Sequence, residues 1–173
     1  MAVEKTIVRS LARRVAGRNA PNLAGAIFGT IVATAVVAGM DESGSVSPPR
    51  ALGVLLGTGA IFWAAHVYAN LLADRIERPG RSKREDLRRL MSREWPLLQS
   101  SFPLAVPLVL SWVGLLSAET ALDLATLVGV IALVGWGISF ARREGYGVAG
   151  IVVAASVNAA FGLLIIGIKA AVA

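Results

Sequence analysis

The chain has 173 residues, of which 55% are hydrophobic, and its mean hydropathy is +0.67; this is too apolar for an ordinary soluble domain. It contains no cysteine, which excludes disulfides, thiolate metal ligands and thiol nucleophiles. The net charge of +6 would suit a nucleic-acid-binding protein, but the basic residues flank apolar segments. We therefore expect anionic membrane lipid as a partner, and no nucleic acid.

Five apolar segments follow one another along the chain, and each is long enough for a helix to cross a hydrocarbon core about 30 Å thick. The sequence therefore predicts an all-α polytopic membrane protein. Its bundle of five transmembrane helices occupies residues 23–173, after a basic cytoplasmic interfacial segment in residues 1–22. The predicted spans cover residues 23–39, 51–73, 97–116, 120–140 and 148–171.

The N-terminal segment is basic and amphipathic. Val3, Ile7 and Leu11 recur every four residues with basic residues opposite them, which is typical of a short helix lying in the membrane interface. Together with Ala33-Thr34-Ala35, this start also resembles a cleavable signal peptide. Cleavage would leave four spans and no exported domain, so we expect an uncleaved first span.

Small residues recur at four-residue intervals in the first two spans, as Gly25 and Gly29 and again as Gly53 and Gly57. This spacing lets helix backbones approach each other closely in lipid. We expect both pairs to serve packing within the chain, with a dimerisation motif as the alternative.

The second span carries the most informative polar residues. His66, Asn70 and Asp74 are four residues apart and Glu77 follows, so all four fall on one face of a helix. Ionisable groups within spans are costly and usually face the bundle interior or a watered cavity. His66 is either a proton acceptor or gate in a vestibule open to the cytoplasm, or a neutral residue hydrogen-bonded to a carbonyl or hydroxyl group.

A cytoplasmic loop, residues 74–95, joins the second span to the third. Ser82 and Glu85 form a capping box that opens a predicted amphipathic helix over residues 82–94. Trp95 is then an interfacial anchor, and Pro96 suits the first turn of the third span. The amphipathic helix is expected to rest on the inner leaflet through Arg84, Arg88, Arg89 and Arg93.

The third span contains Pro103 and Pro107. Each proline removes one intrahelical hydrogen bond, which frees the carbonyls of Gln99 and Pro103 and bends the helix. In lipid, a freed carbonyl needs a partner from a neighbouring helix, a side chain or water. Gln99, Pro103 and Pro107 are therefore candidates for a polar pathway.

Asn158 lies near the middle of the fifth span, on a face that also carries Gly147, Ala154 and Gly162. Interhelical hydrogen bonds of this kind contribute roughly 0.6–2 kcal/mol, so Asn158 is either a packing contact or a second site residue. If the second and fifth spans are neighbours, one polar pocket would hold both His66 and Asn158.

The distribution of Lys and Arg predicts the orientation. With the N-terminus inside, 15 of the 17 basic residues fall in cytoplasmic segments, and only Arg50 and Lys169 lie on the other side. The positive-inside rule then places the N-terminus in the cytoplasm and the C-terminus outside. Arg outnumbers Lys 14 to 3, which suits a GC-rich genome, so we expect a multi-pass protein of the bacterial cytoplasmic (inner) membrane.

Residue types needed for catalysis and metal binding are missing from the predicted spans. Their central parts contain no carboxylate, and the chain has a single histidine, so we expect no metal site and no cofactor. The sequence contains no Ser/His/Asp set, phosphate-binding glycine loop or metalloprotease helix. We therefore expect that the protein is not an enzyme.

Two stretches, Ala69-Asn70-Leu71-Leu72-Ala73-Asp74 and the proline-bearing FPLAVPLVL of residues 102–110, occur in a five-span layout whose longest cytoplasmic loop joins spans two and three. This combination resembles the vacuolar iron transporter family, and the resemblance implies a dimeric five-helix fold. The acidic and methionine ligands of that family's first two spans, and its glutamate-rich metal-binding helices, have no counterparts here. The resemblance thus implies lost or altered metal chemistry and carries over no catalytic residue.

These patterns favour an integral membrane permease or channel for a small ion or solute, working as a homo-oligomer. Histidine changes its charge between about pH 5 and 8, so pH gating through His66 is a further expectation. The alternative is a non-transporting membrane module, either an assembly partner or an anionic-lipid-binding protein. The predicted polar pathway comprises His66, Asn70, Asp74, Asn158, Gln99, Pro103 and Pro107.

Overall fold

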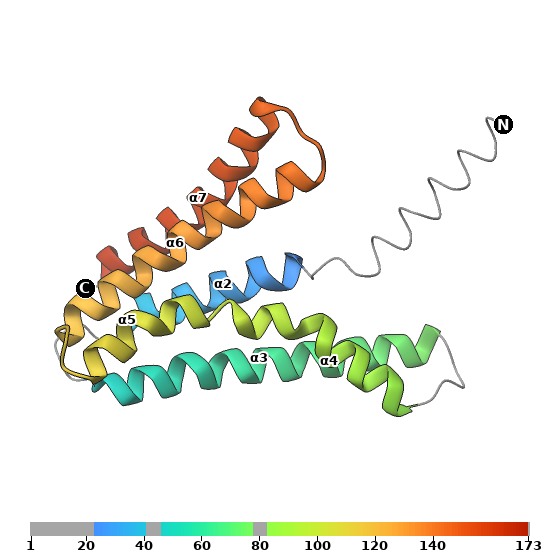
Figure 1. Cartoon of the computed structure of the whole chain (residues 1–173), viewed down its shortest axis with the longest axis horizontal. Coiled ribbons are helices and arrows are strands. Elements are labelled where there is room, and N and C mark those ends of the chain that lie inside the picture. The colour runs from blue at the N-terminus through green and yellow to red at the C-terminus, as the bar shows by residue number, and fades with distance from the viewer. Residues whose placement is uncertain (1–22, 41–45, 78–82, 173) are drawn as a thin grey trace.

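The computed structural model describes residues 23–40, 46–77 and 83–172, and within them the protein has six α-helices and no strand (Figure 1). The all-α prediction is therefore confirmed for this part of the chain. The predicted N-terminal interfacial segment and the capping residue Ser82 lie outside the described residues. The helices are α2 (Leu23–Ala38), α3 (Pro48–Glu77), α4 (Lys83–Gln99), α5 (Phe102–Trp112), α6 (Ala118–Arg143) and α7 (Val148–Val172).

Three of these helices, α3, α6 and α7, are long and apolar enough to cross a membrane. They suggest a multi-pass membrane protein. Helices α2 and α5 are also apolar but have only 16 and 11 residues. At 1.5 Å per residue, α2 is about 24 Å long and α5 about 17 Å long, so α5 alone is much shorter than a hydrocarbon core.

Most helix ends lie close to the predicted span boundaries, because turn-forming or charged residues flank the apolar runs. Helices α2, α6 and α7 begin and end within three residues of the predictions. Helix α3 begins three residues before its predicted span, because Pro48 and Pro49 form its first turn. Proline suits a first helical turn, where its missing N–H has no helical partner to lose.

The helix boundaries around the predicted third span differ in the structure. The amphipathic helix does not end at residue 94 but runs on to Gln99, and Pro96 lies inside α4 rather than at the start of a new helix. The helical conformation is interrupted at Ser100 and Ser101, and α5 then begins with Pro103 in its first turn. Proline disfavours helical conformation in the residue before it, so the Ser-Ser-Phe-Pro stretch restarts the helix here.

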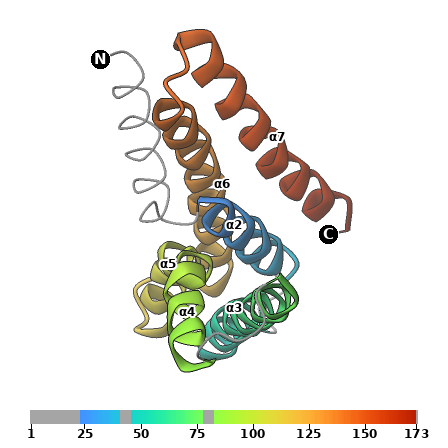
Figure 2. The same ribbon diagram turned by 90° about the vertical axis from the view of Figure 1, so that its right-hand side faces the viewer.

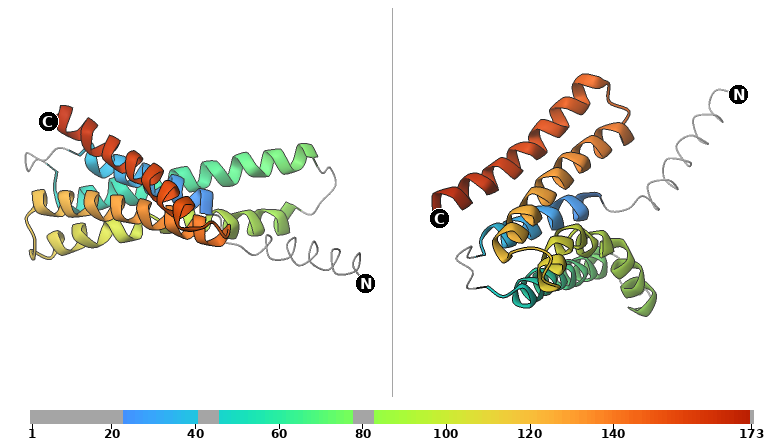
Figure 3. Two further views of the ribbon diagram at one scale, coloured as in Figure 1. Left: turned by 90° about the horizontal axis from the view of Figure 1, so that it is seen from above. Right: turned by 60° about the vertical axis from the view of Figure 1, so that its left-hand side comes forward.

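The helices form a bundle with α7 on its outside (Figures 1 and 2). Helices α4 and α5 together run back along α3, while α2 packs against α3, α4 and α6. Helix α7 pairs with α6 on the outside of the bundle, and only 6% of its apolar window is buried (Figure 3). An ion pair joins the far end of this hairpin, where Lys169 Nζ lies 2.8 Å from Asp123 Oδ1.

The main core lies between α2, α3, α5 and α6, and includes Val37, Leu55, Leu104, Leu108 and Ala125. Helix α6 is also tied to α2 by a polar contact, in which Trp136 Nε1 donates to Thr30 Oγ1 at 3.1 Å. The start of α6 is capped because the Ser117 hydroxyl accepts a hydrogen bond from the backbone N–H of Thr120.

Only one of the two predicted glycine pairs packs within the chain. Gly25 and Gly29 are buried, and a Cβ on Gly29 would collide with the backbone oxygen of Leu97 in α4. Gly53 and Gly57 are exposed, and a Cβ on either would meet no atom within 4 Å. The expectation of intrachain packing is therefore wrong for the second pair.

Candidate functional site

The polar face of α3 lies near the end of the bundle where α3 stops and α4 begins. His66 is half-buried, and its Nδ1 lies 3.1 Å from the backbone oxygen of Phe62 in the same helix. A carbonyl oxygen can only accept a hydrogen bond, so Nδ1 carries the proton in this contact. The ring also packs on Phe28 of α2, with 5.0 Å between ring centroids. The imidazole is therefore held by its own helix and by α2.

One turn further along α3, Asn70 contacts a buried carboxylate. Asn70 Nδ2 donates to Glu94 Oε1 of α4 at 3.2 Å. The Glu94 side chain is only 3% exposed, whereas its ion-pair neighbour Arg93, with Nε at 3.9 Å, is 68% exposed. The Glu94 carboxyl group therefore lies inside the bundle, and the guanidinium of Arg93 lies at the rim.

Glu94 is buried because of its place on α4. Leu90, Glu94 and Leu97 follow at intervals of four and three residues, and all three are buried, so they form one stripe on the helix face that meets α2 and α3. Three of the basic side chains predicted to face lipid, Arg88, Arg89 and Arg93, are exposed on the other faces, and the side chain of Arg84 lies outside the described residues.

Sequence reasoning missed Glu94 because this residue belongs to the charged cytoplasmic loop predicted for residues 74–95. The signal that could have found it is its spacing from two leucines on a helix with an apolar face. The predicted charged arc on α3 is also divided, since Asp74 is exposed while Asn70 is half-buried.

Aromatic side chains hold α3 and α4 together beside this carboxylate. The rings of Trp63 and Trp95 meet edge to face with 6.1 Å between centroids, and Trp63 Nε1 donates to the backbone oxygen of Met91 at 3.4 Å. Trp95 was predicted to be an interfacial anchor. It packs on α3, although 41% of its surface is exposed.

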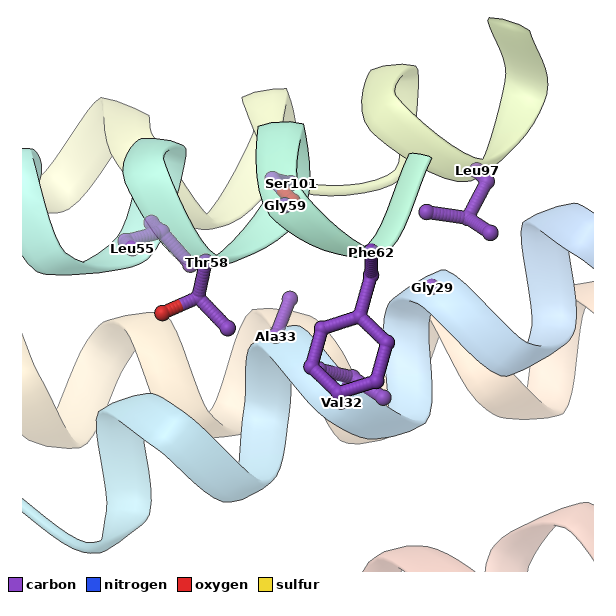
Figure 4. A pocket seen from close by; sticks show the side chains of 9 residues that line it. All are labelled: Gly29, Val32, Ala33, Leu55, Thr58, Gly59, Phe62, Leu97 and Ser101. Carbon is purple, nitrogen blue, oxygen red and sulfur yellow. The ribbon is translucent and has the colours of Figure 1, made fainter. Parts of the chain in front are cut away.

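The candidates of the predicted third span lie around the break between α4 and α5. Gln99 and Pro103 are exposed, whereas Pro107 is buried in the core. A narrow cavity with an empty volume of about 210 Å³ lies between this break, α2 and α3 (Figure 4). Its lining includes Ser101 and Thr58 but neither His66 nor Asn158.

Asn158 belongs to a different part of the molecule. Its Nδ2 donates to the backbone oxygen of Ala154 in its own helix at 3.0 Å, and both residues lie against Gly137 of α6. On the same face, Gly162 lies against Val130. Because α7 packs on α6 and α2 while α3 packs on α2, α4 and α5 (Figure 2), the structure does not bring Asn158 and His66 into one pocket.

Comparison with protein-family models, with curated proteins and with solved structures found no match for the chain. Within the described residues, no three His, Asp or Glu side chains lie close enough together to hold a metal ion. The arrangement that stands out is therefore the buried pair of Asn70 and Glu94, with the ring of His66 one turn away on α3.

Proposed function

We propose that the protein is a permease or channel for a small ion, acting as a homo-oligomer in the bacterial inner membrane. In this proposal the chain crosses the bilayer five times, with the end of α4 and α5 together forming the third crossing. The N-terminus is cytoplasmic and the C-terminus is outside, because this orientation keeps 15 of 17 basic residues in the cytoplasm. The resemblance to the vacuolar iron transporter family stays a prediction.

The observation that carries the transport proposal is the buried carboxylate of Glu94. Removing a carboxylate from water is expensive. Ionisable residues inside membrane bundles are rare and typically mark ion or proton pathways. The side chain accepts a hydrogen bond from the amide of Asn70 at 3.2 Å, and Arg93 Nε lies 3.9 Å away at the exposed rim. Such a group is suited to attract a cation or to take up a proton.

The second candidate is the non-transporting module, and the exposed surface of α7 favours it. Apolar side chains such as Val153, Leu163 and Leu164 are more than 60% exposed, so α7 meets either lipid or another protein chain. This surface would serve an assembly partner as well as it serves a homo-oligomer.

Flux measurements in proteoliposomes discriminate between these functions. The full chain would be reconstituted and tested with H⁺, Na⁺, K⁺ and Cl⁻ gradients, alongside Glu94→Gln and the matched control Glu144→Gln, which alters an exposed glutamate at the end of α6. We expect flux in the native chain, a loss of about tenfold or more in Glu94→Gln, and native flux in the control. Absence of flux for every ion would contradict the permease and favour the module. Full flux in Glu94→Gln would remove this carboxylate from the pathway.

A further inference from the structure

Helix α4 has two apolar rows, and the bundle buries only one of them. The inner row is the buried stripe that carries Glu94. The members of the outer row follow at intervals of four residues and therefore share one face of the helix; they are Leu87, Met91 and Trp95, which are 39%, 39% and 41% exposed. The ring contact of Trp95 with Trp63 of α3 covers one end of this row in part. A charged helix thus presents a second apolar face to its surroundings.

The exposed charges beside the outer row are all positive. Residues 87–99 of α4 contain three arginines and one acidic residue. Arg88, Arg89 and Arg93 are exposed, whereas Glu94 is buried. Burial of Glu94 therefore removes the acidic side chain of this stretch from the surface. The face that α4 turns outward combines apolar side chains with uncancelled basic ones.

The packing of α4 on α2 locates the outer row at the edge of the membrane. Both helices run antiparallel to α3 (Figure 1), and Gly29 of α2 lies against the backbone of Leu97. In the proposed topology, the apolar run of α2 begins at Leu23, about 9 Å before Gly29 along the helix. The same distance before Leu97 on α4 leads to Met91. The membrane boundary therefore crosses the middle of the outer row.

Helix α4 also leans away from α3 toward its first residues, as Figures 1 and 3 both show. Since α3 crosses the membrane in the proposed topology, this lean inclines α4 toward the membrane plane. The outer row extends about 12 Å along the helix from Leu87 to Trp95. An inclined helix brings all three apolar side chains to a similar depth, which is how amphipathic interfacial helices lie.

We propose that the outer row docks on anionic phospholipid at the membrane surface. Leu87, Met91 and Trp95 enter the boundary between headgroups and acyl chains, where tryptophan is enriched in membrane proteins. Arg88 borders the row on the helix surface, and long basic side chains extend to the headgroups while their stems stay on apolar surface. Arg89 and Arg93 add to the attraction toward negatively charged lipid.

The charge of this face favours lipid over a second copy of the chain. In a symmetric dimer the same patch meets itself, so the exposed arginines of the two copies would face each other and repel. Docking on lipid does not require ion flux. Only the identity of the leaflet, which is the cytoplasmic one, rests on the orientation proposed above.

The depth of single labels in the full chain tests this proposal. Because the chain contains no cysteine, a nitroxide can be attached at Met91→Cys in the outer row. The matched control position is Ser92→Cys, the next residue, which is also exposed but points about 100° away around the helix. The protein would be placed in nanodiscs of phosphatidylcholine, with or without phosphatidylglycerol. Accessibility to oxygen, which concentrates in the membrane, and to a water-soluble nickel complex then reports the depth of each label.

In anionic nanodiscs we expect the Met91 label to lie deeper than the Ser92 label. The Met91 label should become shallower in phosphatidylcholine alone and when Arg88→Gln and Arg89→Gln are combined. The ratio of docked to undocked helix should fall about fivefold for each arginine removed. The matched control combines Arg142→Gln and Arg143→Gln, which remove two exposed arginines at the end of α6, and should leave the depth unchanged.

Equal depths for the two labels in anionic nanodiscs would overturn the proposal, as would a Met91 depth that ignores lipid charge and the two arginines. A Met91 label shielded from both oxygen and nickel, with magnetic coupling between copies, would assign the row to a second chain and also overturn it. If Met91→Cys does not fold, Leu87→Cys gives the same comparison. Docking without ion flux would refute the permease alone, and flux without docking would refute this surface alone.

Discussion

The two glycine pairs look alike in the sequence, yet the structure predicts opposite responses to alanine. A methyl group on Gly29 would meet the backbone oxygen of Leu97, and the backbone carbon of Leu97 at 3.1 Å. A backbone group cannot move aside as the end of a flexible side chain can, so α2 and α4 would have to separate. A methyl group on Gly57 would meet nothing within 4 Å.

The expected difference in stability between Gly29→Ala and Gly57→Ala can be estimated by removing the effect that both substitutions share. Both gain the helix propensity of alanine over glycine, about 1 kcal/mol, and this gain cancels in a comparison of the variants. What is left is the overpacking at Gly29, typically about 1–3 kcal/mol. We therefore expect Gly29→Ala to be less stable than Gly57→Ala by about 1–3 kcal/mol.

Reversible unfolding in mixed detergent micelles would measure this difference, with circular dichroism following the helices. Thermal midpoints of the same variants provide a second readout. If Gly29→Ala and Gly57→Ala had the same stability, the close approach of α2 and α4 would be refuted. If Gly57→Ala were the less stable variant, Gly53 and Gly57 would have to lie in a close contact between two subunits.

Two further outcomes follow from particular contacts, and a third follows from the predicted topology. Asn70→Ala should cost about 1.5–3 kcal/mol of stability because the buried Glu94 carboxylate loses a donor; the same change in a Glu94→Gln background should cost clearly less, and equal costs would show that the two groups are not coupled. Ser117→Ala should cost about 0.5–2 kcal/mol through loss of the α6 cap, and amide exchange at Thr120 should accelerate; an unchanged rate would argue against the cap. Topology reporters at residue 85 and at the C-terminus should report opposite sides of the membrane, and the same side for both would contradict five crossings.

Much of the fold could be predicted because hydropathy and helix-ending residues coincide. The α6–α7 hairpin is the clearest case, since Arg142 and Arg143 end one apolar run and Gly145 follows with a φ of +74°. A positive φ is accessible to glycine at little cost, so the turn is set locally. Local signals of this kind do not depend on which helices are neighbours.

The glycine pairs show what local signals leave open. The first two spans are apolar around most of their circumference, so the four-residue spacing marks a face that can pack closely without saying which neighbour meets it. The structure places α4 on Gly29 and the break of the helix on Gly59, a residue outside both pairs. The choice depends on tertiary contacts that no spacing within one helix contains.

The break at Ser100 and Ser101 was missed for a related reason. Pro96 follows the charged segment, which favours it as a helix start, whereas Pro103 and Pro107 are expected to bend the span that it opens. Pro96 is instead accommodated inside α4, and Pro103 takes the first turn of the new helix. The prolines alone do not rank these positions, whereas the packing of Leu97 and Ser100 against Gly29 keeps α4 helical past Pro96.

Two properties of Glu94 predict different environments for it. Its charge predicts an exposed side chain, whereas its position on the helix predicts a buried one. Counted as charge, it belongs with the basic segment that follows α3, and its neighbour Arg93 points to solvent as that view expects. Counted by helical position, it shares a face with Leu90 and Leu97, both of which are buried. The helical position decides, because the apolar stripe of α4 has to be buried against α2 and α3 and takes the carboxylate with it. The amide of Asn70 then lies where the carboxylate needs a donor, so the two residues are best understood as one polar unit that spans α3 and α4.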